Sequence, residues 1–438
     1  MKIGVFGHYG NANLGDEAIV QATMESLRRQ LPKAEIACFS INPVDSSQRH
    51  SVAAYPIRRL SRELTAFPLD GEAPYPVSHF HGPTATPPAV AADTGLRGFL
   101  KRIPILKAAV KKSRSMAASL INFPAEIGFL WKNYRLLRSF DLLMVTGSNQ
   151  FLDNFGGVWG FPYTVLKWSI LARLAGCKLA LVSLGAGPLK STMSKRFCRW
   201  SLSLAHHASY RDEPSRQLIE GRGPAFKGKV YPDVASNIEM PACNTAATRA
   251  VLEIGINPMP VFDRRYWPDG DDHLYEDYLG KLVALVRHVI SQGHSATLYS
   301  TQIQDNAVIG DVLARLDSAE REAVKIAQPR TVDQLLQVLA NLDISVPTRF
   351  HGSVLSVRAG KPTLGICYHR KIGDLLTDVG LGDFQVPIET FSVAEIVALL
   401  DRLVDERQSA SEMVRSSSER YRTLLDQQYS ELAALIDP

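Results

Sequence analysis

The sequence has little cysteine, and none of it forms a metal-binding or redox pattern. No CxxC pair occurs, and no cysteine has a histidine partner at metal-ligand spacing. Scattered thiols of this kind are typical of small buried side chains in a reducing compartment. We therefore expect no metal centre. The five cysteines are Cys38, Cys177, Cys198, Cys243 and Cys367.

Long apolar runs and a strong charge of one sign are also missing. The 438-residue chain is 45% hydrophobic and carries a formal net charge of only +5. Its apolar runs are too short or too charged to span a bilayer, and its start shows no basic, apolar and small-residue pattern of a signal peptide. We expect a cytoplasmic protein, and the composition does not indicate a nucleic-acid partner.

Apolar runs that alternate with amphipathic stretches predict an α/β protein. Residues 1–240 show this alternation, with strands such as 3–6, 142–151 and 179–189, and it starts again at about residue 252. We predict two doubly wound Rossmann-like domains that face each other across a cleft, over 1–240 and 241–438, the second ending in helices. Ligands of such sheets lie off the carboxyl ends of the strands.

The first domain contains an insertion at about 57–138. Its Pro-, Ala- and Thr-rich part, 67–94, has no period, and its basic part from Arg97 to Arg138 holds ten Lys/Arg and one acid, Glu126. Apolar residues alternate with these cations. The basic part, about 97–138, is therefore predicted either to contact an anionic membrane, which would place the protein at the inner face of the plasma membrane, or to pack on its own domain. Both interpretations stay open.

The loop GHYGNANLGDEAI (7–19) joins the first strand to a helix expected from about Ala18. It has neither the Lys-Ser/Thr pair of a Walker A loop nor the spacing of GxGxxG. A strand-to-helix loop favours an anion or a hydroxyl-rich ligand through its backbone N–H groups. Asp16 and Glu17 can equally serve as capping residues at the helix start. The local chemistry leaves the two roles open.

The block PTRFHGSVLSVRAGKPTLGICY (347–368) places Arg349 and His351 where a strand ends and a helix begins at about Ser353. A guanidinium can clamp a carboxylate or phosphate, and an imidazole can transfer a proton near neutral pH. Alternatively, the two side chains merely pair with backbone carbonyls. Arg211 lies at the end of another strand. We expect it either to clamp an anion or to form an ion pair with Asp212.

Lys371 and the pair His206–His207 are further side chains that can carry a positive charge. Lys371 in YHRKIGDLL follows the last core strand, on the side where ligands bind. His206 and His207 lie in a stretch predicted to be helical, without partners, and we expect them to be structural.

These stretches together resemble the polysaccharide pyruvyl transferase family. GHYGNANLGDEAI is similar to its opening loop, and SLGAGPL, SYRDEPS and TRFHGSVLSVRAGKPTLGICYHRK are similar to its later signatures. The resemblance covers most of both domains but not the insertion. After the strand LLMVTG the chain has Ser148–Asn149–Gln150 where the family more often has glycines, in a loop expected to face the acceptor.

The resemblance implies a fold like that of GT-B glycosyltransferases and a transfer of pyruvate from phosphoenolpyruvate (PEP) to hydroxyls of a sugar. The product would be a pyruvate ketal on a cell-surface polysaccharide or its lipid-linked precursor, with release of phosphate and without a cofactor. The expected catalytic residues are His351, Asp16 and Glu17. PEP is expected to meet Arg211, Arg349, Phe350, His351, Gly352 and Lys371. The acceptor is expected to meet Gly10, Asn11, Asn13, Gly15, Asp16, Asn149 and Gln150.

Two other functions are compatible with the architecture. A GT-B nucleotide-sugar glycosyltransferase would need a carboxylate in the second domain for the ribose hydroxyls, and no E-x7-E pattern follows His351. A non-catalytic scaffold in glycan assembly is disfavoured by the combination of arginine, histidine and an acidic loop. Stabilisation by PEP, by a nucleoside diphosphate or by neither would separate the three.

Overall fold

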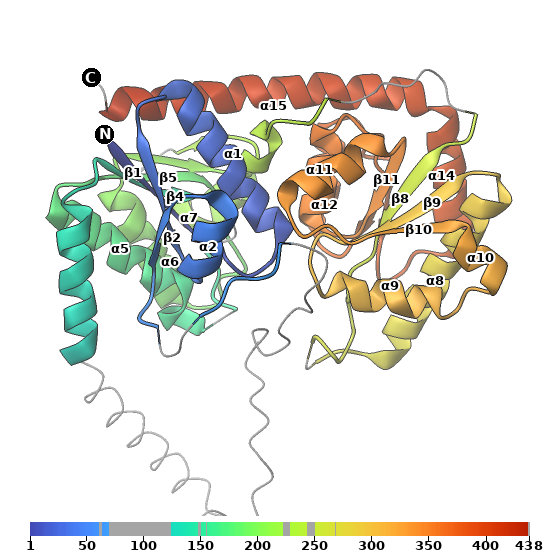
Figure 1. Cartoon of the computed structure of the whole chain (residues 1–438), viewed down its shortest axis with the longest axis horizontal. Coiled ribbons are helices and arrows are strands. Elements are labelled where there is room, and N and C mark those ends of the chain that lie inside the picture. The colour runs from blue at the N-terminus through green and yellow to red at the C-terminus, as the bar shows by residue number, and fades with distance from the viewer. Residues whose placement is uncertain are drawn as a thin grey trace, which may run out of the picture.

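Two parallel β-sheets, each covered by helices, organise the chain in a computed structural model (Figure 1). The structure describes residues 1–60, 64–69, 124–147, 150–154, 156–221, 228–242, 250–267 and 269–436.

The first sheet has seven parallel strands in the order β3-β2-β1-β4-β5-β6-β7. Its central strands are apolar and buried on both faces, as expected for a parallel sheet between two helical layers. The strands are β1 (Lys2–Phe6), β2 (Glu35–Ser40), β3 (Ala53–Pro56), β4 (Leu142–Thr146), β5 (Lys178–Leu184), β6 (His207–Tyr210) and β7 (Lys229–Val230). The helices are α1 (Leu14–Gln30), α2 (Pro43–His50), η2 (Gly157–Trp159), α5 (Phe161–Ala175), α6 (Thr192–Leu204), α7 (Glu213–Glu220) and η3 (Val234–Asn237). Residues 124–137 are also helical.

The second sheet repeats the same order of strands along the chain. Its first four strands run β10-β9-β8-β11, and a parallel bridge between Ser345 and Thr363 links β11 to the pair β12-β13. The strands are β8 (Glu253–Asn257), β9 (Ser295–Tyr299), β10 (Val324–Ala327), β11 (Ile344–Pro347), β12 (Gly365–Cys367) and β13 (Gln385–Pro387). The helices are α8 (Asp272–Ser291), α9 (Asp305–Leu313), α10 (Ser318–Glu322), α11 (Val332–Asn341), α12 (Phe350–Arg358), α13 (Arg370–Asp378), α14 (Val393–Asp405) and α15 (Arg407–Ile436). Strand order 3-2-1-4-5-6 is that of a Rossmann-like domain, so the predicted doubly wound fold class is confirmed.

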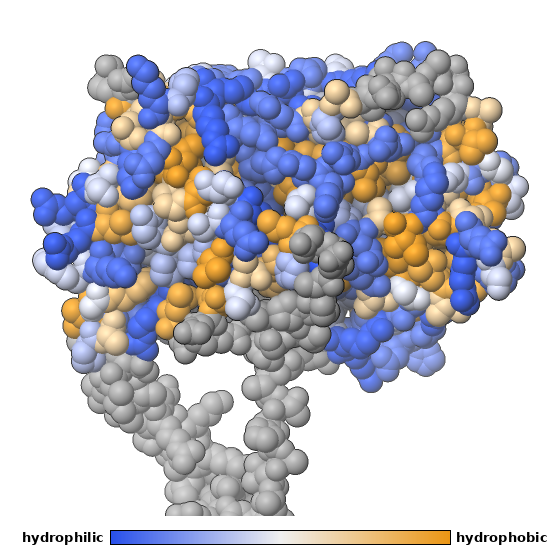
Figure 2. Space-filling model, in the orientation of Figure 1, coloured by the Kyte–Doolittle hydropathy of each residue, from blue (hydrophilic) through white to orange (hydrophobic). Residues whose placement is uncertain are grey.

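The long helix α15 spans both domains (Figure 1). Its first half contributes Ala410 and Val414 to the core of the second domain, while Tyr429 and Leu432 belong to a core that includes Ile3. The surface along α15 is mainly hydrophilic (Figure 2). The sequence analysis assigned all closing helices to the second domain, but the last turns of α15 pack on the first.

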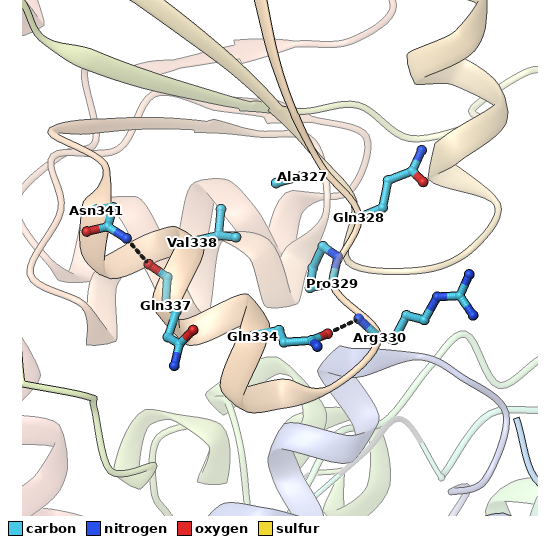
Figure 3. A pocket seen from close by; sticks show the side chains of 8 residues that line it. All are labelled: Ala327, Gln328, Pro329, Arg330, Gln334, Gln337, Val338 and Asn341. Carbon is cyan, nitrogen blue, oxygen red and sulfur yellow. Dashed lines mark hydrogen bonds between the residues drawn. The ribbon is translucent and has the colours of Figure 1, made fainter. Parts of the chain in front are cut away.

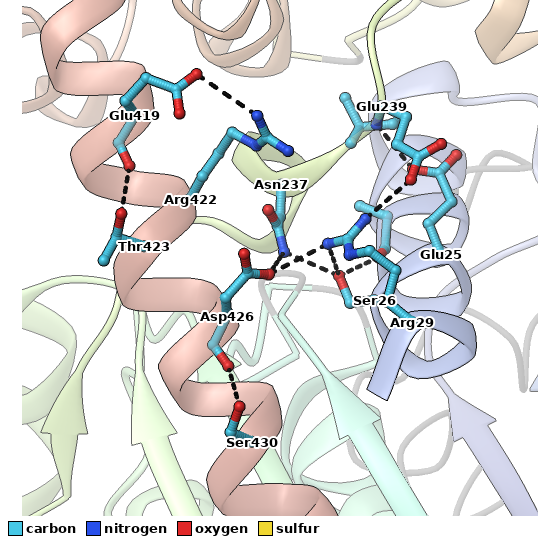
Figure 4. A network of polar contacts seen from close by, with 12 residues as sticks. Glu25, Ser26, Arg29, Asn237, Glu239, Glu419, Arg422, Thr423, Asp426 and Ser430 are labelled. Atoms are coloured by element: carbon cyan, nitrogen blue, oxygen red, sulfur yellow. Dashed lines mark hydrogen bonds and ion pairs between the residues drawn. The ribbon is translucent and has the colours of Figure 1, made fainter. Parts of the chain in front are cut away.

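Polar contacts fasten α15 to the first domain (Figure 4). The buried Asn237 in η3 donates through Nδ2 to Ser26 Oγ of α1 and to Asp426 Oδ1 of α15, both at 3.0 Å. Arg29 also contacts the Asp426 carboxylate, at 3.2 Å. Three segments far apart in the sequence are thus tied together at one buried amide.

Two helices begin earlier than the sequence predicts. α1 starts at Leu14 because the Asn13 side chain accepts a hydrogen bond from the Gly15 N–H and caps it. α12 starts at Phe350, so Arg349 occupies its N-cap position. The helical assignment of His206 and His207 is wrong: α6 ends at Leu204, and His207 opens β6.

The insertion lies largely outside the described residues, and so does most of the basic segment at about 97–138. Among the helices in the described parts of the chain, none is long and apolar enough to cross a membrane.

Candidate active site

The opening loop and the Arg-Phe-His motif meet at the contact between the two domains. Leu14 N donates to Thr301 O at 3.0 Å, and Asn13 forms an antiparallel bridge with Gln302. A Cβ atom on Gly15 would lie only 2.3 Å from His351 Nδ1, so this position requires the absence of a side chain. The domain contact therefore brings the acidic loop directly against the histidine.

Glu17 holds the opening loop together from inside. Its carboxylate is fully buried, with Oε1 accepting from Gly10 N at 2.9 Å and Oε2 lying 2.8 Å from His50 Nε2. Burial would raise the pKa of Glu17, but the hydrogen bond with His50 and the nearby Arg49 charge lower it below the ordinary value. Both oxygens are engaged within the protein, so Glu17 supports the loop and does not meet a substrate, unlike the sequence prediction.

Asp16, the residue before Glu17, makes different contacts. Its Oδ2 accepts from Asn13 Nδ2 at 3.0 Å and lies 3.9 Å from His8 Nδ1. The Asp16 charge also acts on the pKa of His351, which it raises. Of the two carboxylates predicted to be catalytic, only Asp16 is therefore in a position to act on the histidine.

The other residues predicted to bind the acceptor mainly shape their own loops. Gly10 adopts a left-handed φ of 80° against the backbone of Asn42, a conformation that favours glycine. Asn11 lies 2.9 Å from His8 through Nδ2 and Nδ1, and its Oδ1 accepts from Asn13 N. Gln150 is buried, its Nε2 donates to Thr146 O at 2.9 Å, and its Oε1 has no hydrogen-bond partner among the described residues, so its contact with an acceptor stays a prediction. Asn149 lies outside the described residues.

His351 lies in the first turn of α12, where its ring faces both domains. Nε2 is buried without a hydrogen-bond partner in the described part of the chain, and Asp233 Oδ2 lies 3.9 Å away. Burial lowers the pKa of His351, and the charges of Asp233 and Asp16 act in the opposite direction. The imidazole is therefore neutral near pH 7, with one nitrogen available to a ligand.

Arg211 approaches from the end of β6 in the first domain. Its Nη1 donates to Asp233 Oδ2 at 3.1 Å, and its guanidinium lies 4.8 Å from the centre of the Phe350 ring. Asp233 also accepts from Ala235 N through Oδ1 and so caps η3. The predicted residues Arg211, Phe350 and His351 are thus brought together by an aspartate that the sequence analysis missed. The only indication of Asp233 in the sequence was the polar end of the strand VYPDVAS.

Arg349 is an ion-pair partner and not an open clamp. Its Nε and Nη2 both donate to Asp305 Oδ1, at 2.8 and 2.6 Å. The buried Asp305 accepts through Oδ2 from the N–H groups of Thr301 and Gln302, both at 3.0 Å. The alternative weighed from the sequence was pairing with carbonyls, but the partner is this carboxylate, which no pattern indicated.

Lys371 and Gly352 complete the predicted donor residues. Burial and the nearby Arg211 charge lower the pKa of Lys371 to about 7, with Asp212 acting in the opposite direction. This ammonium therefore titrates near neutrality. Gly352 backs onto Asn257, where a Cβ would lie 2.8 Å from Oδ1, so it allows α12 to pack closely on β8.

The model of the polysaccharide pyruvyl transferase family matches residues 13–370. The chain belongs to this family. Among characterised relatives, the amylovoran biosynthesis protein AmsJ of Erwinia amylovora is 19% identical over 308 residues, which cover 66% of this chain and 71% of AmsJ.

Solved structures extend the likeness to the fold. HepE of Anabaena in complex with UDP superposes with a TM-score of 0.53 at 11% identity, covering 99% of this chain and 98% of HepE. MnaA of S. aureus, solved with UDP, gives a TM-score of 0.53 at 9% identity and covers 94% and 90% of the two chains. At these identities the likeness shows the fold alone, and it confirms the predicted GT-B-like arrangement of this pyruvyl transferase family member.

Two hollows, lined mainly by residues of the second domain, share part of their lining. The larger, of about 420 Å³, runs along α11 between Ala327 and Asn341 and is lined by the amide side chains of Gln328, Gln334, Gln337 and Asn341 (Figure 3). The smaller, of about 40 Å³, is lined by Ala12 and Leu14 of the opening loop and by Gln302 and Asn306. Gln328, Pro329 and Arg330 line both.

Neither hollow is lined by His351, Arg211 or Arg349, but residues next to their contacts in the chain line the smaller one. Leu14 precedes Gly15, which touches the histidine, and Asn306 follows Asp305, which holds Arg349. The open space next to the motifs is thus polar and rich in amides. In the described ranges, no group of three or more His, Cys, Asp or Glu side chains is arranged to hold a metal ion.

Proposed function

We propose that this protein transfers pyruvate from PEP to hydroxyl groups of a sugar in polysaccharide biosynthesis and forms a ketal. The observation that carries this is the His351 Nε2 atom, which is buried and without a hydrogen-bond partner in the described structure. It lies where acidic and cationic side chains of both domains meet. Family membership supports a transferase, and the donor and the ketal chemistry are our proposal.

The donor PEP is small and carries a phosphate and a carboxylate. The positive charges of Arg211 and Lys371 both lower the pKa of His351, so these are the two cations that act on the histidine. The first turns of α12 and α13 add partial positive charge. Arg349 pairs with Asp305 through both Nε and Nη2, and we assign it the task of positioning α12. Arg211 is also paired, with Asp233 at 3.1 Å and Asp212 at 3.7 Å. Its charge and that of Lys371 nevertheless act on His351, so we assign donor binding to these two.

A single neutral imidazole can both accept and pass on the proton that moves in the first step. His351 takes the proton of the sugar hydroxyl and passes it to the methylene carbon of PEP, which becomes a methyl group, and the hydroxyl oxygen bonds to C2 as cationic character develops there. A second hydroxyl then bonds to C2 as the C2–O bond to phosphate breaks, and its proton leaves with the phosphate. Asp16 raises the pKa of the histidine and so stabilises the imidazolium between the two transfers.

We place the acceptor on the side of the small hollow beside the opening loop. The amide groups of Gln302 and Asn306 can each donate to and accept from sugar hydroxyls. The Asn306 Oδ1 atom is buried without a partner in the described residues. The identity of the sugar follows from experiment.

The decisive experiment is mass spectrometry of candidate glycans incubated with PEP and the purified protein. We expect a gain of one pyruvate ketal with stoichiometric phosphate release, and loss of both with His351→Ala. A parallel thermal-shift assay should show stabilisation by PEP. Stabilisation by UDP and not by PEP would instead support a nucleotide-sugar glycosyltransferase, since HepE and MnaA were solved with UDP.

A further inference from the structure

Large aromatic side chains stand exposed on the first domain, in and beside helices α5 and α6. Trp159 of η2 is 72% exposed and Trp200 of α6 is 51% exposed. Phe197 lies between them, with ring centres 6.0 and 5.9 Å from the two tryptophans. Tyr163 of α5 adds a ring 5.2 Å from Trp159. These four residues form a connected row of rings, with Phe197 buried between the exposed tryptophans, and we call it the aromatic row. Exposed patches of this kind mark interaction surfaces.

The aromatic row continues toward the helix at 124–137. The Lys167 ammonium lies 5.7 Å from the Tyr163 ring centre and 5.3 Å from that of Phe129 in this helix. The same helix carries Trp131, which is 61% exposed. Three of the five tryptophans of the chain are therefore exposed in this part of the first domain.

The segment that carries the aromatic row contains no acidic residue, and one of its cations, Lys167, pairs with Glu126 of the helix at 124–137 at 2.9 Å. Residues 154–206 hold seven Lys/Arg and no Asp or Glu. Lys190, Lys195 and Arg196 form no ion pair with any described residue. Met193, Arg196 and Trp200 are three and four residues apart on α6, so they share the exposed side of this helix.

We propose that the aromatic row, with Lys195 and Arg196, binds the surface of an anionic lipid bilayer. Tryptophan and tyrosine side chains are enriched where headgroups meet hydrocarbon, and lysine and arginine beside them attract anionic headgroups. A second copy of the same face is disfavoured, because a self-complementary contact would set like charges against each other. The aromatic row lies outside the basic segment at 97–138 and adjoins the helix at 124–137 that ends this segment, and the inference does not depend on the proposed reaction.

The test is co-sedimentation of the full-length protein with vesicles of phosphatidylcholine alone and of phosphatidylcholine with about one-third phosphatidylglycerol. We expect the wild type to bind the phosphatidylglycerol vesicles, more weakly at high salt. The double variant Trp159→Ser/Trp200→Ser and the double variant Lys195→Glu/Arg196→Glu should each lose at least about tenfold in partition coefficient. Trp267→Ser is the matched control, since Trp267 is 36% exposed but lies in the second domain.

Each outcome decides for or against this surface. All variants retain residues 97–138, so a loss of binding in the two double variants with the control unchanged supports the aromatic row. Wild-type binding in both double variants, or no vesicle binding by the wild type, overturns it. A dimer in analytical ultracentrifugation that Trp159→Ser/Trp200→Ser dissociates would make a second copy the occupant and also overturn it. Circular dichroism checks folding, and phosphate release with a soluble acceptor should stay unchanged, which separates this test from that of the reaction.

Discussion

Replacing Gly15 by alanine should disturb the candidate active site more than the fold. The added Cβ would lie 2.3, 2.4 and 2.5 Å from Nδ1, Cγ and Cβ of His351. Ordinary contact begins at 3.4 Å, and the atoms met are the ring and its root, which cannot swing away like the end of a long side chain. The histidine must therefore move by about 1 Å, or α1 and α12 must separate by as much.

The expected loss of activity follows from that displacement. A misplacement of about 1 Å in a catalytic geometry costs on the order of 100-fold, or about 2.7 kcal/mol of activation free energy. Overpacking destabilises by about 1–3 kcal/mol, while alanine gains up to about 1 kcal/mol over glycine within a helix. We expect the free energy of unfolding to fall by less than the activation free energy rises.

The assay is phosphate release from PEP with the acceptor, alongside urea unfolding. Gly280→Ala in α8 is the matched control, because beyond the adjacent backbone of its own helix no atom lies within 4 Å of its added Cβ. That variant should keep its activity and gain up to about 1 kcal/mol of stability. Wild-type kcat/KM in Gly15→Ala, with His351→Ala inactive, would refute the inferred contact between loop and histidine.

Three further predictions address charge. Asp305→Asn leaves the guanidinium of Arg349 without its carboxylate, and should lower the free energy of unfolding by about 3 kcal/mol or more in urea denaturation. The pKa of Lys371 is lowered to about 7, so binding of anionic PEP to its protonated form should weaken as pH rises above about 7, and Lys371→Arg should remove this dependence in calorimetric titrations. The pKa of Glu17 is lowered from 4.5, so the stability it contributes is present above that value and is lost as pH falls through the folded-state pKa. Glu17→Gln should therefore reduce the acid sensitivity of unfolding. Asp16→Asn should mainly lower kcat. An equal loss of kcat in both variants would contradict the assignment of a structural role to Glu17 and a catalytic role to Asp16.

Local patterns in the sequence were sufficient for the fold class. The alternation of buried strands and amphipathic helices specifies two doubly wound domains, because periodicity reports which side of each element is buried. The Arg-Phe-His block was recognisable for the same reason, since a strand end followed by a helix start is a local feature. The helix starts themselves were placed too late, because Asn13 and Arg349 occupy cap positions that depend on backbone geometry.

Only the tertiary structure decided which of the predicted side chains meet at the domain contact and which hold a loop together. Asp16 and Glu17 are neighbours in sequence, yet one lies near the histidine while the other is enclosed with His50. The carboxylates that hold the two arginines, Asp233 and Asp305, come from other elements, and no spacing along the chain could indicate them. Sequence alone determined which elements form and where polar groups gather at their ends. Burial and charge pairing depend on how two domains and a returning helix pack, and that was settled by contacts between residues hundreds of positions apart.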